Sequence, residues 1–350
     1  MANTWPTPGS FTDQMIDRPA GLRASDLAKE FDLLTEEHLD YFVAIRIATR
    51  LGRAEEPDVE GVTYAVALEI FGFVLGDEWM DNHIGPPTGA PHPSDSRTFL
   101  RTDSLDESHS SIRHMRHVET LASCLYNLQH IPGFKHRVAE LKRNDLESAL
   151  GEMEGARFLS HPSLKLRFVV PTGKKGECYE AEITTLEERV ICCEVKTKKE
   201  QTEFNQATVK NTIEHARKQL SKGKPGMILL HIPEGWATRD NQAPIEDEIK
   251  RKFRQSNRLV AIVVLWDEWR TNGGKHLTLR KYLPYLNTRS SLYAPDVEQV
   301  FQTLVGINNP QWIELQWFVR AKFDYLLEMV KQSMAAGSQS DTQENQEPPE

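Results

Sequence analysis

Hydrophobic and polar positions follow two different periods along this 350-residue chain. Up to about residue 144, apolar residues recur every three or four positions, which is the spacing of an amphipathic helix. Thr35, followed by two glutamates, is a typical helix N-cap. Residues 85–110 are rich in proline, glycine and serine and are expected to form a loop. The pattern predicts a helical region over 26–144, with helices at residues 35–52, 61–84, 112–131 and 134–144.

From about residue 145 the spacing changes to a mixture of helical stripes and alternating strands. An amphipathic helix is predicted over 145–159, followed by three short strands at 165–171, 178–184 and 190–197. A long helix, a buried strand, a second helix and two further strands follow, at 204–223, 226–233, 244–256, 258–269 and 276–283. Three meandering strands followed by helical crossovers predict an α/β domain with a mixed sheet over residues 145–290.

The two ends of the chain differ from this pattern. Residues 1–25 and 335–350 are polar and low in complexity, so both are predicted to be disordered. Residues 291–334 return to helical spacing and are expected to pack on the α/β core as C-terminal helices. No apolar run approaches the ~20 residues that a membrane-spanning helix needs, and no secretory signal is visible at the N-terminus.

Composition narrows the function classes. The net charge of −9 argues against a protein that coats nucleic acid non-specifically. Residues 161–260 are the exception, with 19 basic and 14 acidic residues, and could meet phosphate locally. The four cysteines form no C-x-x-C pair, and the adjacent Cys192 and Cys193 would point to opposite faces of a strand. A structural zinc site or disulfide framework is therefore not expected, and reduced thiols favour a cytoplasmic protein.

Charged residues interrupt two of the apolar strands in a regular way. Side chains two apart on a strand share a face, so Glu194 and Lys196 lie together, as do Glu180 and Glu182. If the two strands pair as a hairpin through "TLEER", these acidic faces come side by side. Clustered carboxylates need a compensating charge, and Mg²⁺ or Mn²⁺ would provide it because these ions take oxygen ligands. The pattern therefore predicts a metal site with a lysine beside it.

This arrangement of elements and residues resembles the PD-(D/E)xK, or restriction-endonuclease-like, nuclease superfamily over residues of about 145–285. The E-x-K of that family corresponds to Glu194-Val195-Lys196, the second-strand acid to Glu180, and the helix acid to Glu152. The resemblance implies a restriction-endonuclease-like fold and magnesium-dependent hydrolysis of phosphodiester bonds in DNA. It further implies metal ligation by Glu180, Glu194 and the Val195 carbonyl, with Lys196 positioning the attacking water.

Several alternatives stay open. Glu154 is an alternative to Glu152 as the helix acid. Glu182 is an alternative to Glu180, which itself stands where the family usually has an aspartate. Gln206 and Lys210, on the following helix, are candidates for contacts with the nucleic-acid backbone. A second hypothesis is a catalytically degenerate module of the same fold that binds nucleic acid or a protein partner. The oligomeric state is open, with a homodimer as one option.

Overall fold

The structure is a computed structural model that describes residues 24–84, 108–143, 146–171, 178–199, 202–272, 275–306, 309 and 311–344. The chain divides into two compact units. The first comprises residues 1–89, 100–127 and 313–350, and the second comprises residues 90–99 and 128–312. The predicted loop at 85–110 and the predicted disorder at 1–25 fall almost entirely outside the described residues.

The first unit is built from helices. Thr35 caps α3 (Glu36–Gly52) as predicted, since its hydroxyl accepts a hydrogen bond from the His38 N–H. The predicted helix at 61–84 is two helices, because Gly76, with a φ of 88°, interrupts it. The helices of this unit are α2 (Ala24–Leu27), α3, α4 (Val59–Val74), α5 (Asp77–His83), α6 (Ser108–Leu128) and α12 (Leu315–Glu344).

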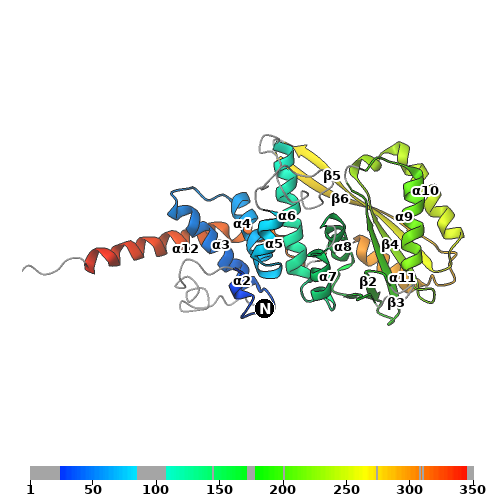
Figure 1. Ribbon diagram of the computed structural model, residues 1–350, viewed down its shortest axis with the longest axis horizontal. Coiled ribbons are helices and arrows are strands. Elements are labelled where there is room, and N and C mark those ends of the chain that lie inside the picture. The colour runs from blue at the N-terminus through cyan, green and yellow to red at the C-terminus, as the bar shows by residue number, and fades with distance from the viewer. Residues whose placement is uncertain are drawn as a thin grey trace, which may run out of the picture. The chain divides into compact units, whose positions relative to one another are not determined.

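The second unit contains a mixed six-stranded sheet whose strands lie side by side in sequence order, so the predicted α/β class is confirmed (Figure 1). Strands β3, β4 and β5 are parallel, and the other neighbours are antiparallel. The strands are β1 (Lys165–Phe168), β2 (Ala181–Thr184), β3 (Val190–Thr197), β4 (Gly226–His231), β5 (Leu259–Asn272) and β6 (Lys275–Leu286).

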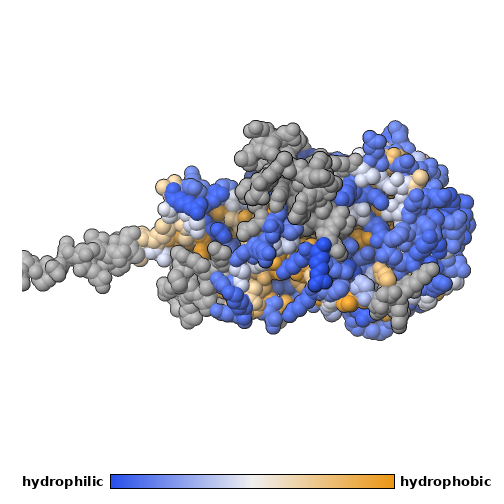
Figure 2. Space-filling view, viewed as in Figure 1, coloured by the Kyte–Doolittle hydropathy of each residue, from blue (hydrophilic) through white to orange (hydrophobic). Residues whose placement is uncertain are grey.

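Helices cover both faces of this sheet. The crossover helices α9 (Gln206–Gln219) and α10 (Arg239–Arg254) pack on one face and bury an apolar cluster that includes Cys192, Ile228 and Leu230. Both crossovers lie on the same face because parallel connections share one hand. Figure 2 shows that the outer surface over α9 and α10 is mainly hydrophilic. The remaining helices of the unit are α7 (Phe134–Leu141), α8 (Leu146–Leu159) and α11 (Pro295–Gly306), with the 3-10 helix η2 (Glu234–Trp236).

Helix α8 packs very closely on the opposite face of β3. A Cβ atom added to Gly151 would lie 1.8 Å from the Thr197 hydroxyl, and one added to Gly155 would lie 2.7 Å from the Val195 side chain. Because a larger residue at either position would push the helix away, the two glycines allow this approach. The close packing brings the acidic residues of α8 down to the sheet.

Four features differ from the sequence-based expectations. Helix α12 packs on α3 and α4 in the first unit, whereas it was expected on the α/β core. It also continues to Glu344, ten residues into the tail predicted to be disordered. Helix α10 begins at Arg239, five residues before the predicted start at Pro244. The unit boundary near residue 127 places α7 with the α/β unit. No helix among the described residues is long and apolar enough to cross a membrane.

Candidate metal centre

The predicted acidic hairpin forms, and its register places Glu180 next to Glu194. Strands β2 and β3 are antiparallel, with Ala181 opposite Cys193 and Glu182 opposite Cys192. Strand β2 begins at Ala181, so Glu180 precedes it by one residue, at the end of the ladder where Cys193 is followed by Glu194. Strand β3 runs on to Thr197, so its last four residues extend beyond the β2 ladder. The site therefore lies where β3 has lost its β2 neighbour.

Glu194 is completely buried, and its charge is poorly compensated. It has no exposed surface, and its carboxylate accepts no main-chain hydrogen bond among the described residues. The ammonium of Lys196 lies in ion-pair contact with Glu194 Oε1. Ile228 is its neighbour on β4, in the apolar layer beneath α9. A buried carboxylate that lacks hydrogen bonds is costly unless it is protonated or meets a cation.

Glu180 turns back onto the edge of β3. Its Oε2 accepts a hydrogen bond of 2.9 Å from the Val195 N–H, and its Oε1 lies 3.7 Å from Lys196 Nζ. The carboxylate thus takes a backbone donor that the β2 ladder leaves free. The N–H and C=O of one strand residue point to the same edge, so the Val195 carbonyl faces the side on which Glu180 lies. The longer glutamate arm still reaches β3.

The protonation equilibria reflect an excess of carboxylates. Burial and the neighbouring Glu180 raise the pKa of the Glu194 carboxyl well above its ordinary value. Burial disfavours the Lys196 ammonium, but the surrounding carboxylates, first among them Glu180, outweigh it and raise the pKa of that lysine. Burial, again with Glu180, raises the pKa of Glu152 to about 7. The cluster therefore favours protons on its acids, and a divalent cation could replace those protons.

Glu152 lies at the edge of this cluster, on α8, and its direct partner is an arginine. Arg137 Nη1 donates to Glu152 Oε2 at 3.1 Å and to Glu140 Oε2 at 2.6 Å. The same guanidinium donates through Nη2 to the Glu180 main-chain carbonyl at 2.9 Å, so Arg137 links Glu152 to the segment that carries Glu180. Sequence reasoning missed Arg137, because nothing in the spacing of α7 distinguishes it from an exposed helix arginine.

Glu182, the alternative second-strand acid, does not join the cluster. Its Oε1 accepts hydrogen bonds from the Tyr179 hydroxyl at 2.5 Å and from Lys224 Nζ at 2.9 Å. Its Oε2 accepts from Arg167 Nε at 2.6 Å. These donors more than offset burial and lower the pKa of Glu182 below its ordinary value. Glu182 is a satisfied structural carboxylate, so the choice between the two second-strand acids favours Glu180.

The two proposed nucleic-acid contacts lie in the first turns of α9. Both Gln206 and Lys210 are exposed. Gln206 Nε2 donates to Glu248 Oε1 on α10 at 3.2 Å, which ties this side chain to the neighbouring helix. Because α9 follows the end of β3, both residues lie toward the end of the sheet that carries Lys196. No contact joins either of them to the acidic cluster within the part of the chain that the structure describes.

Glu154, the alternative helix acid, belongs to a second cluster. His231 lies 3.6 Å from both Glu154 and Asp267, and the ligand atoms of these three residues all lie within 4.8 Å of one another. Thr197 pairs with His231 across β3 and β4, so this cluster lies on the α8 face, opposite Glu194. Arg280, the cross-strand partner of Asp267, forms two hydrogen bonds of 2.8 Å with it and also donates to Glu154.

The second cluster is neutralised from within, although its spacing would suit a metal. Burial disfavours the charge of Asp267, but Arg280 and His231 outweigh it and hold the pKa of that carboxyl far below its usual range. Because the guanidinium already binds both carboxylates, a cation would have to displace it. The sequence alone did not reveal this cluster, since it depends on the register between three strands and a helix.

No family model, no curated protein and no solved structure matches this chain. The geometry of the second unit therefore carries the functional argument by itself.

Proposed function

We propose that the chain is a magnesium-dependent nuclease that hydrolyses phosphodiester bonds in DNA, at a site formed by Glu180, Glu194 and Lys196. The observation that carries the proposal is the carboxylate of Glu194, which is fully buried beside a second glutamate and has the Lys196 ammonium as its charged partner. The donors are all oxygens, which suits Mg²⁺ or Mn²⁺. The order of helix, three antiparallel strands, helix and parallel strand supports a restriction-endonuclease-like fold.

The residues of the chain have distinct tasks in this proposal. Glu180 and Glu194 would hold the cation together with the Val195 carbonyl, which faces the same edge as Glu180. When bound, the cation supplies charge stabilisation on the phosphate and acidifies a water molecule. With a cation bound to Glu194, Lys196 would be free to donate a hydrogen bond to the attacking water or to a phosphate oxygen. Glu194 has no exposed surface, so its own contact with the cation would be shielded from bulk water.

A second candidate, a non-cleaving module of the same fold, is favoured by the ion pair between Glu194 and Lys196. In that case Lys196 permanently neutralises Glu194. The hydrogen bond from the Val195 N–H to Glu180 then stabilises the edge of β3. The module would bind nucleic acid or a protein partner without a metal ion. Metal dependence separates the two candidates.

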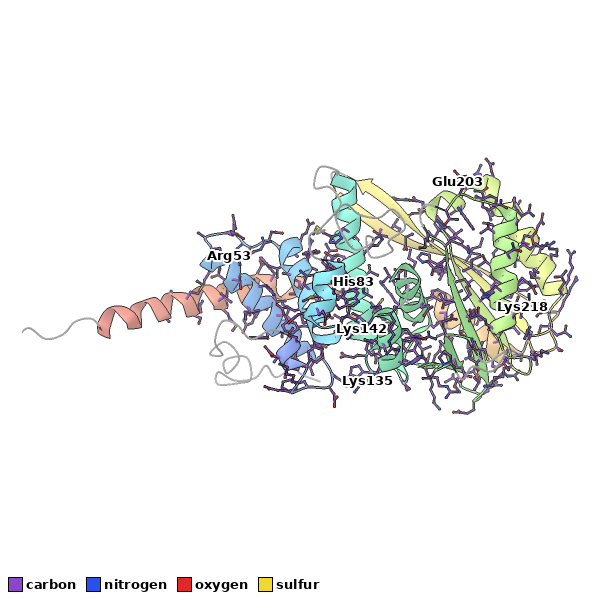
Figure 3. The ribbon with its side chains drawn as sticks, viewed as in Figure 1. Arg53, His83, Lys135, Lys142, Glu203 and Lys218 are labelled. Atoms are coloured by element: carbon purple, nitrogen blue, oxygen red, sulfur yellow. The ribbon has the colours of Figure 1, made fainter. Side chains whose placement is uncertain are left out.

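The experiment is cleavage of plasmid DNA by the full chain in Mg²⁺, compared with the Lys196→Ala variant. Loss of one charged donor at a developing negative charge lowers the rate by about 10²–10³-fold, while the far-UV circular dichroism stays unchanged. Lys218→Ala is the matched control, because Lys218 is exposed on α9 and pairs only loosely with Glu214, at 3.6 Å (Figure 3). A Lys196→Ala chain that cleaves as fast as the parent refutes the proposal.

A further inference from the structure

Arg137 is a buried arginine held by acceptors from several elements. It belongs to α7 and is 6% exposed. Nη1 bonds to Glu140 and Glu152, whereas Nη2 donates to the main-chain carbonyl of Glu180 at 2.9 Å and reaches that of Val169 at 3.5 Å. One guanidinium therefore connects α7, α8 and the segment that enters β2. These are the elements that carry the acids of the candidate metal centre, apart from β3.

The anchoring of Arg137 makes its charge a fixed part of the site. The main-chain bond from the Phe168 N–H to the Pro132 carbonyl, 2.8 Å long, fastens the start of α7 to the end of β1. The planar fork of the guanidinium matches its carboxylate and carbonyl acceptors. Moving it would take the charged donor from the half-buried carboxylates of Glu140 and Glu152, which is unfavourable. Arg137 is thus not available to a substrate.

The balance of charges suggests what this fixed cation does. The ion pairs of Arg137 and Lys196 involve four carboxylates, those of Glu140, Glu152, Glu180 and Glu194. When all four acids are ionised, the deficit is two charges, which one divalent cation neutralises. His136, whose Nε2 lies 3.2 Å from Glu140, adds a charge only when it is protonated. A second divalent cation would leave the site with excess positive charge.

We propose that Arg137 occupies the place of a second cation: it binds Glu152 outside the coordination shell and restricts the site to a single divalent ion. Arg137 is a positioning residue in this scheme, and Glu152 acts through it. The inference rests on the proposed metal site and assigns Glu152 a role different from that of a ligand. It also makes the chemistry of the site that of one metal ion and one lysine.

The test is the stoichiometry of Mn²⁺ binding to the full chain, measured by isothermal titration calorimetry and by electron paramagnetic resonance. We expect one Mn²⁺ in the parent chain and a second, weaker Mn²⁺ in Arg137→Met, which exposes Glu152 and Glu140 to metal. Lys135→Met removes the same charge from an exposed position on the same helix and should keep a single ion (Figure 3).

A second variant decides the matter if Arg137→Met fails to fold. Glu152→Gln should still bind one Mn²⁺ with an affinity within about tenfold of the parent, because only the longer-range attraction of one charge is lost. A parent chain that binds two Mn²⁺, or a Glu152→Gln chain that binds as poorly as Glu194→Gln, overturns this inference alone. A parent chain that binds no Mn²⁺ overturns the proposed function, and the inference with it.

Discussion

Two acidic clusters lie on opposite faces of the same sheet, and they differ in how their charge is balanced. In the cluster of Glu154 and Asp267, Arg280 bonds to both carboxylates, and the lowered pKa of Asp267 keeps that acid in its charged form. In the cluster of Glu180 and Glu194, one lysine serves both acids, and Glu194 favours its proton.

Burial does not separate these clusters, because both contain acids with little exposed surface. The hydrogen bonds from the one fixed cation of each cluster do, because Arg280 donates three to Glu154 and Asp267, whereas Lys196 lies 3.7 Å from Glu180. A guanidinium that donates hydrogen bonds to two acids stabilises both in their charged form. A single ammonium does so less well, so the acids beside it can bind a further cation. Spacing alone would select the other cluster, since the group that most resembles a metal-ligand set contains His231, and Arg280 already binds both of its carboxylates.

The largest expected contrast between the clusters is in stability. Arg280→Met leaves two buried carboxylates without their donor, so the free energy of unfolding should fall by about 3 kcal/mol. Lys196→Met should cost only about 1 kcal/mol, because Glu194 already favours the neutral form. Urea unfolding of both variants without metal measures the difference. Equal losses would mean that the two clusters are compensated in the same way.

The second contrast concerns pH. Glu152 has a pKa of about 7 in the folded chain against 4.5 for the free side chain, so the folded state holds more protons between these values. In EDTA, the free energy of unfolding should fall as the pH rises through this window, by on the order of 2 kcal/mol for this group. Saturating Mg²⁺ should reduce this fall in the free energy of unfolding. The Glu152→Gln variant should lack the part of the fall that comes from Glu152. Urea unfolding at about pH 5 and about pH 8 measures the slope.

The outcome that would count against this account is a metal-free chain whose stability rises over the same window. That result would show that the cluster prefers its ionised form, as Asp267 does on the other face. Asp267 should contribute no such fall, because its lowered pKa places its titration below the window.

The smallest expected effect is at the surface of α9. Lys210→Ala should weaken DNA binding by about 1 kcal/mol and reduce the salt dependence of the affinity by about one charge, as expected for a single phosphate contact. Lys250→Ala on α10, an exposed lysine paired with Glu246, is the matched control. Fluorescence anisotropy at several salt concentrations measures both variants. Identical salt dependence of the Lys210→Ala variant and the parent would remove Lys210 from the interface.

Local rules predicted part of this structure well. The bounds of β3 and the antiparallel hairpin followed from period-two alternation and a short turn, whereas β2 begins at Ala181, after the predicted start at 178, and leaves Glu180 outside the strand. The role of Glu182 did not follow, because its partners Arg167 and Lys224 come from other elements. Period and spacing describe one strand or helix at a time, so they identify acids that share a face but not the cations that reach them.

Tertiary packing decided the remaining differences. Arg137 and Arg280 each act from an element whose own pattern is unremarkable, and only the fold places them against acids 15 and 126 residues away. The packing of α12 on α3 and α4 joins the two ends of the chain, which no local pattern could indicate. The two arginines nevertheless determine which acids still lack a strong positively charged partner and could bind a metal ion.

The most direct test of which cluster binds a metal ion is a Mn²⁺ titration by isothermal titration calorimetry. The chains compared are the parent, Glu194→Gln and Asp267→Asn. The account predicts that Glu194→Gln weakens binding by about a hundredfold or more, and that Asp267→Asn leaves the Kd within about threefold of the parent. Mn²⁺ binding that survives in Glu194→Gln but is lost in Asp267→Asn would contradict the account and place the metal on the opposite face of the sheet.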